Sequence, residues 1–377
     1  MRPDNASAYA PQENKGAKRG LKLIFAGGGT GGHLFPAIAL AEEFKRRDPN
    51  VEITFVGGAG GLEEKIVPKY GYPLKVFNVE GIKRRRGFTR VRALAKAAKS
   101  TMEAIGFLKS TRPDAVIGCG SYSSAPVVTA ARLLKVRTAI LEQNALPGLT
   151  NKLLGRFVDR VYISFEESRK FFPGGRTILS GNPVRRDIIR KLEDGRVADK
   201  FTILVFGGSQ GATAINAAFL DAIEFLTDIW SGLRVMHQTG NEGYEMAVAA
   251  YKRKNLKVEA FKFIEDMGTA YNSADLVICR AGATSLAEIT AAGLAAILIP
   301  YPFAADDHQA VNARCLEKAG AALMIKQDKL TGASLAEAIR RLYNDRQALR
   351  TMREKSKALG RPRAAQEIAD NLLRILN

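Results

Sequence analysis

Short apolar runs alternate with longer amphipathic stretches along most of the chain. Nine runs of seven or eight residues have the pattern of buried strands: 21–27, 51–57, 73–79, 114–120 and 137–144, then 201–207, 233–240, 275–282 and 295–302. Between them, apolar residues recur at helical spacing, as in Phe35–Arg47, Thr213–Leu226 and Ser285–Ala292. This alternation is typical of βα units, so the pattern predicts an α/β protein whose parallel sheets are covered by helices on both faces.

The order of strand, glycine loop and helix occurs twice, at 21–47 and at 201–226. A polar stretch without an apolar strand separates the two occurrences, and we place an interdomain linker there, at residues 183–200. A chain of 377 residues, 46% of them hydrophobic, is long enough for two cores. We therefore predict two Rossmann-like domains, 21–182 and 201–357, that face each other across a cleft. Ligands are then expected at the loops that follow the strands.

The N-terminal residues, the cysteines and the net charge indicate which compartment and which partners to expect. Residues 1–20 are polar and carry no apolar segment, so we expect a disordered tail and no secretory signal. The three cysteines, Cys119, Cys279 and Cys315, have no metal-binding spacing and indicate buried thiols in a reducing compartment. No apolar run approaches the roughly 18 residues that span a bilayer, so any membrane contact is expected to be peripheral. The formal net charge of +19 favours anionic partners.

The first glycine loop, "GGGTGGH" at residues 27–33, has five glycines among its first six residues. Such a loop exposes backbone N–H groups at a helix N-terminus and admits an anion closely, which suggests a phosphate-like ligand; a tight turn is the alternative. A P-loop would need Lys-Ser/Thr where His33 and Leu34 stand, so an ATPase is excluded. The second strand ends in glycines and not in an acidic residue, which weakens an NAD site.

Two further glycine loops follow predicted strands, "VFGGSQGATAIN" at 205–216 and "IGCGSYSSAP" at 117–126. Three such loops at one cleft suggest a ligand that carries several oxygens, although serines in the third also suit a helix cap. His33 stands beside a helix N-terminus, which favours a neutral general base or hydrogen-bond donor over a packing residue. Glu288 lies in the first turns of another helix, where a carboxylate accepts ribose hydroxyls or merely complements the helix dipole.

A basic stretch, "EGIKRRRGFTRVRALAKAAK" at residues 80–99, holds eight Lys and Arg residues interleaved with apolar ones. Cations beside apolar side chains suit an anionic membrane surface, and a solvated helix face is the bland alternative. Phe88 is the single aromatic residue of the stretch and no nucleic-acid fold signature occurs, so we expect no nucleic-acid partner.

Eight segments together resemble the MurG family of bacterial cell-wall synthesis: "GGGTGGHLFPAIALA", "GCGSYSSAP", "LEQNALPGLTNKLL", "SGNPVRRD", "VFGGSQGATAIN", "HQTG", "ICRAGATSLAEI" and "DDHQAVNA". The match runs from about residue 21 to the C-terminus. The resemblance implies a GT-B fold, with the acceptor and the membrane bound by the first domain and UDP-N-acetylglucosamine (UDP-GlcNAc) by the second. It also implies that a helix at 358–377 crosses back to the first domain.

The family resemblance implies an inverting, metal-independent transfer of N-acetylglucosamine from UDP-GlcNAc to the C4 hydroxyl of undecaprenyl-diphospho-MurNAc-pentapeptide, lipid I, which gives lipid II. No cofactor is implied. The expected place is the cytoplasmic face of the bacterial cell membrane, with peripheral attachment to its anionic inner surface.

Site residues follow from the motifs, position by position. His33 is our own assignment for the general base, and the resemblance implies that Tyr122 is an acceptor contact. The implied donor-binding residues are Thr30, Gly31, Gly32, Asn144, Arg185, Ser209, Ile264, Ala283, Thr284, Ser285, Leu286, Ala287, Glu288 and Gln309. Among these, Arg185 and Ser209 resemble diphosphate contacts, and Ile264 resembles a uracil contact made through its backbone.

One loop departs from the family pattern, which is close to "GGYVSGP". Here Ser121 and Ala125 replace two of its glycines, so we expect a loop of different shape. Three other functions stay open at this point: another inverting glycosyltransferase with a lipid acceptor, a UDP-GlcNAc 2-epimerase, and a non-catalytic basic binding protein.

Overall fold

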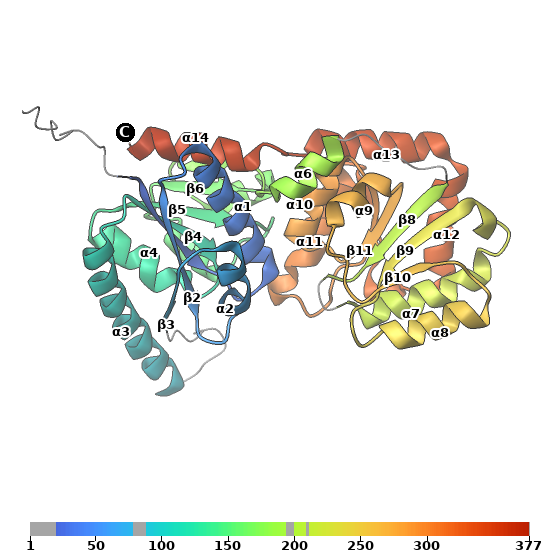
Figure 1. Cartoon of the computed structure of the whole chain (residues 1–377), viewed down its shortest axis with the longest axis horizontal. Helices are drawn as coiled ribbons and strands as arrows, with labels where there is room; N and C mark the ends of the chain where they lie inside the picture. Colours follow the sequence, from blue (N-terminus) through green and yellow to red (C-terminus); the bar gives the residue numbers. More distant parts are fainter. Residues whose placement is uncertain (1–19, 78–87, 194–199, 209–210, 377) are drawn as a thin grey trace, which may run out of the picture.

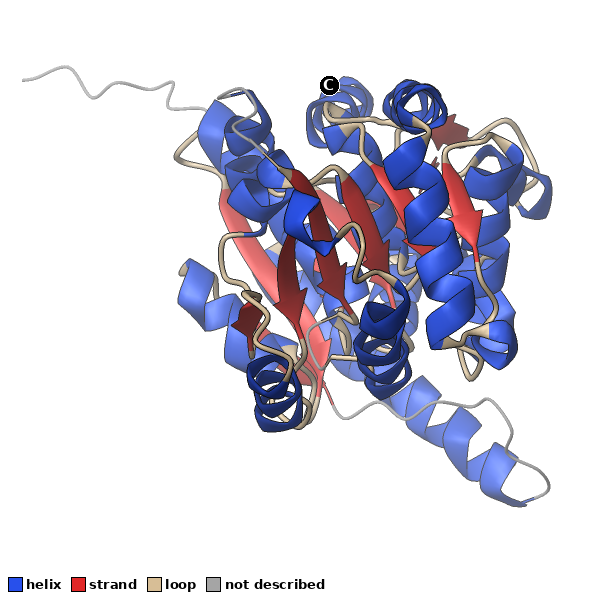
Figure 2. Ribbon diagram, turned by 90° about the vertical axis from the view of Figure 1, so that its right-hand side faces the viewer, coloured by secondary structure: helices blue, strands red, loops and turns tan. Residues whose placement is uncertain are grey.

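The computed structural model describes residues 20–77, 88–193, 200–208 and 211–376. The described strands form two sheets that lie side by side, one in each half of the chain, and all of their pairings are parallel (Figure 1). Viewed from the side, the strands run between layers of helices (Figure 2). The predicted α/β class with two parallel sheets is thus confirmed.

The first sheet has seven strands in the order β3-β2-β1-β4-β5-β6-β7, and the second has six in the order β10-β9-β8-β11-β12-β13. The first comprises β1 (Lys22–Gly27), β2 (Glu52–Gly58), β3 (Leu74–Phe77), β4 (Ala115–Gly120), β5 (Arg137–Glu142), β6 (Arg160–Ile163) and β7 (Thr177–Leu179). The second comprises β8 (Phe201–Phe206), β9 (Leu233–Gln238), β10 (Glu259–Phe261), β11 (Leu276–Cys279), β12 (Ala295–Leu298) and β13 (Ala322–Met324).

Helices follow most strands, as a parallel sheet requires. The first half contains α1 (Gly31–Arg47), α2 (Glu63–Ile66), α3 (Phe88–Thr111), α4 (Ser124–Leu133) and α5 (Leu149–Leu154). The later helices are α6 (Arg186–Glu193), α7 (Thr213–Ala222), α8 (Tyr244–Arg253), α9 (Met267–Ser273), α10 (Ala283–Ala292), α11 (His308–Lys318), α12 (Gly332–Asn344), α13 (Arg346–Leu359) and α14 (Ala364–Leu376).

All nine predicted apolar runs contain strands, but four short strands, β6, β7, β10 and β13, were not predicted. Each has only three or four residues, too few to show a period of their own. Three of the four are edge strands, and pairing with a longer neighbour fixes them in the sheet.

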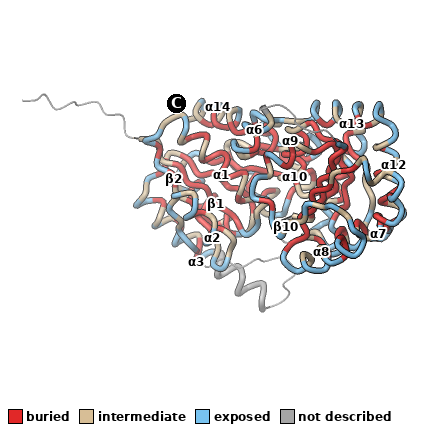
Figure 3. The backbone as a smooth tube through the Cα atoms, turned by 45° about the vertical axis from the view of Figure 1, so that its right-hand side comes forward, coloured by how far each residue is buried: buried red, intermediate tan, exposed pale blue. Residues whose placement is uncertain are grey.

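The cores lie on both faces of each sheet. Along β1, Phe25 packs into the cluster on one face and Ile24 into the cluster on the other. In β8, Val205 likewise packs into the cluster on one face of the second sheet and Leu204 into the cluster on the other. Figure 3 shows the buried residues concentrated in the strands and the exposed ones on the outer helices. Burial on both faces explains why the strands are nearly continuous apolar runs.

The last helix, α14, returns to the first half of the chain and packs against α1 (Figure 1). Ile368 and Leu372 are fully buried in the core beside β1, and Tyr162 on β6 donates a hydrogen bond to Asn371 Oδ1 (2.9 Å). Part of the predicted linker also has structure, because α6 buries Ile188 in the second core. The domain bounds given above stay a prediction; the tail at 1–19 and linker residues 194–199 lie outside the described residues.

Candidate active site

The N-termini of two helices from different halves meet between the sheets. Helix α1 begins at Gly31 after β1, and α10 begins at Ala283 after β11. Thr284 Oγ1 donates a hydrogen bond to the carbonyl oxygen of Gly32 (3.1 Å) and accepts one from Asn182 Nδ2 (3.4 Å). Both helix N-termini carry unpaired N–H groups and a positive dipole end, so this junction suits an anion.

A cavity of about 190 Å³ lies beside this junction, and both halves of the chain line it. His33, Tyr122 and Asn144 come from the first half, and Asp306 and His308 come from the second. The structure therefore brings the predicted base and the predicted acceptor contact into one cavity.

The His33 ring has defined neighbours within this cavity. Its Nδ1 lies 3.3 Å from Thr30 Oγ1, and its Cδ2–Nε2 edge packs against Gly120, where a Cβ would come within 2.8 Å of Nε2. Desolvation by burial lowers the pKa of His33 below its ordinary value, although the Gly28 carbonyl and Glu63 act in the opposite direction. A lowered pKa keeps the imidazole neutral near pH 7, the state that a general base needs.

The serine-rich loop keeps a backbone conformation that glycine favours. Gly120 has φ +101° and Ser121 has φ +71°, whereas Ala125 lies within α4. Serine at 121 thus occupies the left-handed region that we expected it to resist. Tyr122 is 40% exposed at the cavity, which leaves its side chain accessible to an acceptor.

Two buried residues that sequence reasoning missed hold the Asn144 loop. Glu142 accepts hydrogen bonds from the Asn144 N–H (2.9 Å) and from Asn151 Nδ2 (2.9 Å), and burial raises its pKa to about 7. Asn312 on α11 reaches across from the second half, accepting from the Ala145 N–H (2.9 Å) and donating to Asn144 Oδ1 (3.1 Å). Glu142 could have been predicted, because it stands beside Asn144 in the "EQN" motif. The contact between Asn312 and Asn144 could not, because the two residues are 168 positions apart in the sequence.

One turn after Thr284, α10 carries the predicted ribose contact. Glu288 is 9% exposed and accepts a hydrogen bond from the Tyr271 hydroxyl (2.9 Å). Burial raises the pKa of Glu288 to about 7, while Tyr271 and the nearby Arg185 counteract this shift. Arg185 also lies over the Phe35 ring of α1, with 5.5 Å from guanidinium carbon to ring centroid. Arg185 is therefore shared between the two halves.

The other predicted donor contacts are spread along the second half. The Ile264 N–H donates to Gln238 Oε1 (2.8 Å), and Gln238 Nε2 donates to the carbonyl oxygen of Gly208 (2.8 Å). A ligand that accepts a hydrogen bond from the Ile264 N–H must displace Gln238 Oε1 from it. Gln238 is therefore a further residue of the candidate site, one that we did not predict. Gln309 Oε1 accepts from the Tyr301 N–H (3.0 Å).

Within the predicted segment 283–288, the side chains point to different places. Thr284 contacts Gly32 and Glu288 contacts Tyr271, whereas Ala283, Leu286 and Ala287 line a separate cavity. Ser285 is partly exposed. Ser209 lies outside the described residues. Among the residues that the structure describes, no group of three or more His, Cys, Asp or Glu side chains could hold a metal ion.

The buried carboxylate of Glu63 holds the backbone of the first glycine loop through hydrogen bonds. Its carboxylate is 1% exposed and accepts hydrogen bonds from the Gly29 N–H (2.7 Å) and the Gly58 N–H (2.9 Å). A Cβ on Gly28, Gly57 or Gly61 would overlap this side chain. These glycines are thus needed for the close approach of a carboxylate, a reason that the sequence alone does not reveal.

Replacing Glu63 with glutamine is expected to lower the free energy of unfolding by about 1–3 kcal/mol. The amide keeps the shape but sets an NH₂ donor against one of the two backbone N–H donors, which leaves that donor unpaired. Urea unfolding followed by circular dichroism measures the change. Glu64→Gln is the matched control, because Glu64 accepts from one exposed N–H, that of Gly60. Equal stability of the two variants would contradict the supporting role of Glu63.

Comparisons with known proteins cover both halves of the chain. The model of the glycosyltransferase family 28 N-terminal domain matches residues 23–163, and that of the family 28 C-terminal domain matches residues 202–368. A protein of Syntrophus aciditrophicus is 48% identical over 94% of this chain and 99% of its own length, and one of Myxococcus xanthus is 49% identical over 93% and 92%. Both are named UDP-N-acetylglucosamine–N-acetylmuramyl-(pentapeptide) pyrophosphoryl-undecaprenol N-acetylglucosamine transferase.

Solved structures with a similar fold include a MurG protein and a UDP-GlcNAc 2-epimerase. The crystal structure of Acinetobacter baumannii MurG is 32% identical and superposes with a TM-score of 0.78 over 94% of this chain and 99% of its own. A UDP-GlcNAc 2-epimerase of Neisseria meningitidis shares the fold at a TM-score of 0.64 over 94% and 99%, but with only 12% identity. From the two family models, the close relatives and this structural match, we conclude that the chain belongs to glycosyltransferase family 28 and, within it, to the MurG family.

Proposed function

We propose that the protein transfers N-acetylglucosamine from UDP-GlcNAc to the C4 hydroxyl of the MurNAc sugar of lipid I and so forms lipid II. The names of the close relatives support this substrate pair. The observation that carries the proposal is the meeting of the α1 and α10 N-termini at Gly32 and Thr284, next to the cavity that contains His33. An anion-binding junction beside a neutral histidine is what a transfer from a nucleotide sugar to a hydroxyl requires.

The proposed chemistry is a single displacement with inversion at C1 of the sugar. His33 takes the proton of the acceptor hydroxyl, whose oxygen forms the new bond to C1 as the bond from C1 to the UDP oxygen breaks. Since Nδ1 faces Thr30, we assign the proton to Nε2, on the edge next to Gly120. The charge that develops on UDP is stabilised by the two helix N-termini and by Arg185.

We also propose the binding roles of the remaining predicted residues. Glu288 accepts the ribose hydroxyls, with Tyr271 holding its carboxylate in place. Asn144 contacts the transferred sugar, and Asn312 fixes its side chain. Tyr122 contacts the acceptor. The donor thus lies mainly against α10 and the acceptor mainly against the first half of the chain.

A purified preparation given UDP-GlcNAc and a soluble lipid I analogue tests the reaction. UDP release that depends on the acceptor, with a disaccharide product, is expected. Formation of UDP-ManNAc without acceptor would instead indicate an epimerase, and absence of UDP release with every lipid acceptor would indicate a binding protein.

We further propose that the protein works peripherally at the cytoplasmic face of the cell membrane. In the described part of the chain, no helix is long and apolar enough to cross a bilayer. Helices α3 and α4 pack together, and each exposes a large apolar side chain: Met102 is 68% exposed and Leu133 is 65% exposed. Exposed Arg132 and Lys135 flank Leu133. Along the chain, Met102 follows the basic stretch 80–99, whose charges would meet anionic lipids; residues 80–87 and the side chains of 88–97 lie outside the described part of the structure.

The double substitution Met102→Ser and Leu133→Ser is expected to weaken binding to vesicles of anionic phospholipid by about tenfold, because two apolar side chains no longer enter the interface. Sedimentation with vesicles measures the bound fraction. The control is Phe225→Ser with Met246→Ser, two comparably exposed residues of the second half. Equal losses in both double variants would contradict a specific membrane surface on α3 and α4.

A further inference from the structure

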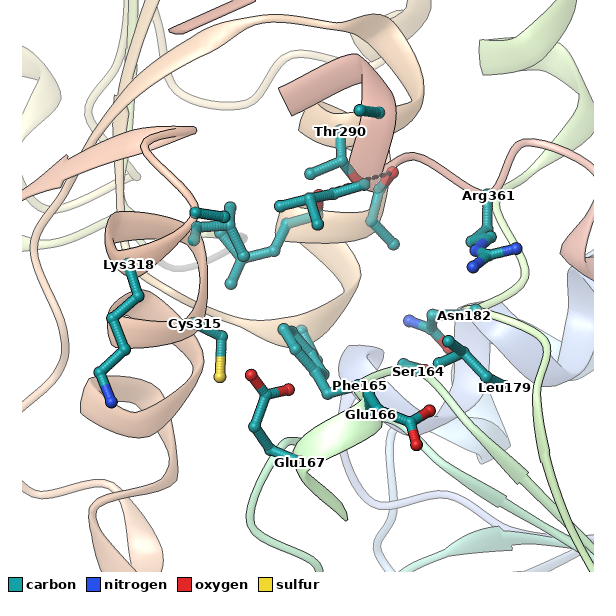
Figure 4. Close-up of a pocket in the computed structure, with 18 residues that line it drawn as sticks. Ser164, Phe165, Glu166, Glu167, Leu179, Asn182, Thr290, Cys315, Lys318 and Arg361 are labelled. Atoms are coloured by element: carbon teal, nitrogen blue, oxygen red, sulfur yellow. Dashed lines mark hydrogen bonds between the residues drawn. The ribbon is translucent and has the colours of Figure 1, made fainter. Parts of the chain in front are cut away.

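The chain passes between its two halves twice, first after β7 and again between α13 and α14. Figure 4 shows Asn182 of the first crossing and Arg361 of the second on the same side of a cavity that both crossings line. The first crossing is held in place, because a Cβ on Gly181 would overlap Arg361 and because Asn182 Nδ2 donates to Thr284 Oγ1 (3.4 Å). Arg185 follows three residues after Asn182, so its side chain projects from a backbone of fixed position.

Two aromatic residues of the first half hold the Arg185 side chain. Its guanidinium carbon lies over the Phe35 ring, 5.5 Å from the centroid, and the ring itself lies against Gly31 at the start of α1, where a Cβ would be 3.1 Å from it. Tyr70 ends the short helix Val67–Tyr70 and packs against the same core as Phe35. Its hydroxyl accepts a hydrogen bond from the guanidinium. We call Phe35 and Tyr70 the aromatic seat of Arg185.

The acidic neighbours of Arg185 belong to the second half and leave the guanidinium open to an anion. Asp187 Oδ2 is 3.5 Å from Arg185 Nη1, but its side chain is 64% exposed, so water screens this ion pair and a ligand can replace it. Burial lowers the pKa of Arg185, whereas the charges of Asp187 and Glu288 raise it, and the net result lies above its ordinary value. The charged side chain is 20% exposed, so an anion in the cleft can reach it.

We propose that Phe35 and Tyr70 are positioning residues, which hold the guanidinium of Arg185 where it meets the diphosphate of the donor and do not themselves touch the donor. A cation over a ring face and a hydrogen bond to the fork of the guanidinium together restrict where its charge lies. Without the seat, donor binding would have to order a long side chain that otherwise turns to Asp187 and to water. The inference rests on the diphosphate role proposed for Arg185.

A double-mutant cycle, with UDP titrated calorimetrically into the full chain, tests the seat. Phe35→Leu keeps an apolar side chain but removes the ring face, and we expect about fivefold weaker UDP binding. Tyr70→Phe removes only the hydroxyl, and we expect about five- to tenfold weaker binding. Arg185→Ala should weaken UDP binding by roughly 10–100-fold, and neither substitution should weaken it further in that background.

Matched controls make the same chemical changes elsewhere in the first half. Phe157→Leu and Tyr72→Phe alter half-buried aromatic residues outside the seat, and both should bind UDP as the parent does. Uridine lacks the diphosphate, so its affinity, measured by NMR titration, should be the same in the parent and in every variant.

A parent-like UDP affinity in Phe35→Leu or in Tyr70→Phe would overturn the role of that residue. An equal loss with and without Arg185, or an equal loss for UDP and uridine, would show that the rings act only on stability and would overturn the seat as a whole. Tyr70→Phe decides the matter even if Phe35→Leu does not fold. Parent-like UDP binding by Arg185→Ala would overturn the diphosphate contact and the seat together, while acceptor-dependent UDP release by the parent tests the proposed function separately.

Discussion

His33→Ala is expected to reduce turnover by roughly 10²–10⁴-fold, because the acceptor hydroxyl loses the group that takes its proton. UDP binding should change little, since in the proposed site the helix N-termini and Arg185, and not the imidazole, hold the diphosphate. Steady-state kinetics with a lipid I analogue, together with calorimetry of UDP, separates the two effects. In the parent protein the acidic limb of the pH profile of kcat, measured at saturating UDP-GlcNAc, should lie below pH 6.5, since burial lowers the pKa of His33.

His308→Ala provides the matched control for this prediction. His308 lines the same cavity, but its Nδ1 is 2.7 Å from the carbonyl oxygen of Ala305, which makes it part of the loop structure. We expect its loss to reduce turnover much less than the loss of His33. Parent-like turnover in His33→Ala, with loss of turnover in Glu142→Gln, would move the role of base to the buried carboxyl of Glu142.

Glu288→Gln is expected to raise the KM for UDP-GlcNAc by roughly 10–100-fold, the loss that corresponds to hydrogen bonds with a charged acceptor. Its kcat should fall less, because the proposed contact of Glu288 is with the nucleotide and not with the reacting atoms. Initial rates over a range of UDP-GlcNAc concentrations measure both constants. A donor KM equal to that of the parent would remove Glu288 from the ribose site.

The same carboxyl predicts a pH dependence of donor binding. Burial raises the pKa of Glu288 to about 7, so its carboxylate form, which accepts hydrogen bonds, is lost as the pH falls through 7. The KM for UDP-GlcNAc should thus rise between pH 8 and pH 6 in the parent and stay flat in Glu288→Gln. Tyr271→Phe removes a donor that stabilises the carboxylate, so it should shift this transition to higher pH.

Many of the site residues were recognisable because they sit in contiguous motifs. His33 and Thr30 share a glycine loop, and Glu288 follows the helix start at Ala283. Asn312 and Gln238 also lie in quoted motifs, "DDHQAVNA" and "HQTG", but the motifs did not show their partners: Asn312 reaches Asn144, and Gln238 joins Gly208 to Ile264. Spacing in the chain carries no information about contacts of this kind, because they depend on how the sheets are arranged.

The sequence by itself determined the order of strands and helices and the positions of the glycine loops. A strand buried on both faces must be apolar along its whole length, and a loop at a helix N-terminus must expose its N–H groups; both constraints are local. It did not determine the short strands β6, β7, β10 and β13, which are stabilised by pairing with their neighbours.

Only the tertiary structure decided which groups are desolvated and which lie side by side. The pKa values of Glu142 and Glu288, the Glu63 carboxylate under the first glycine loop and the left-handed Ser121 all follow from packing between distant segments. The free energy of a buried charge or an unpaired acceptor depends on its neighbours in space. For this reason the motif at His33 could be identified along the chain, whereas the cavity that His33 lines together with residues of the second half required the fold.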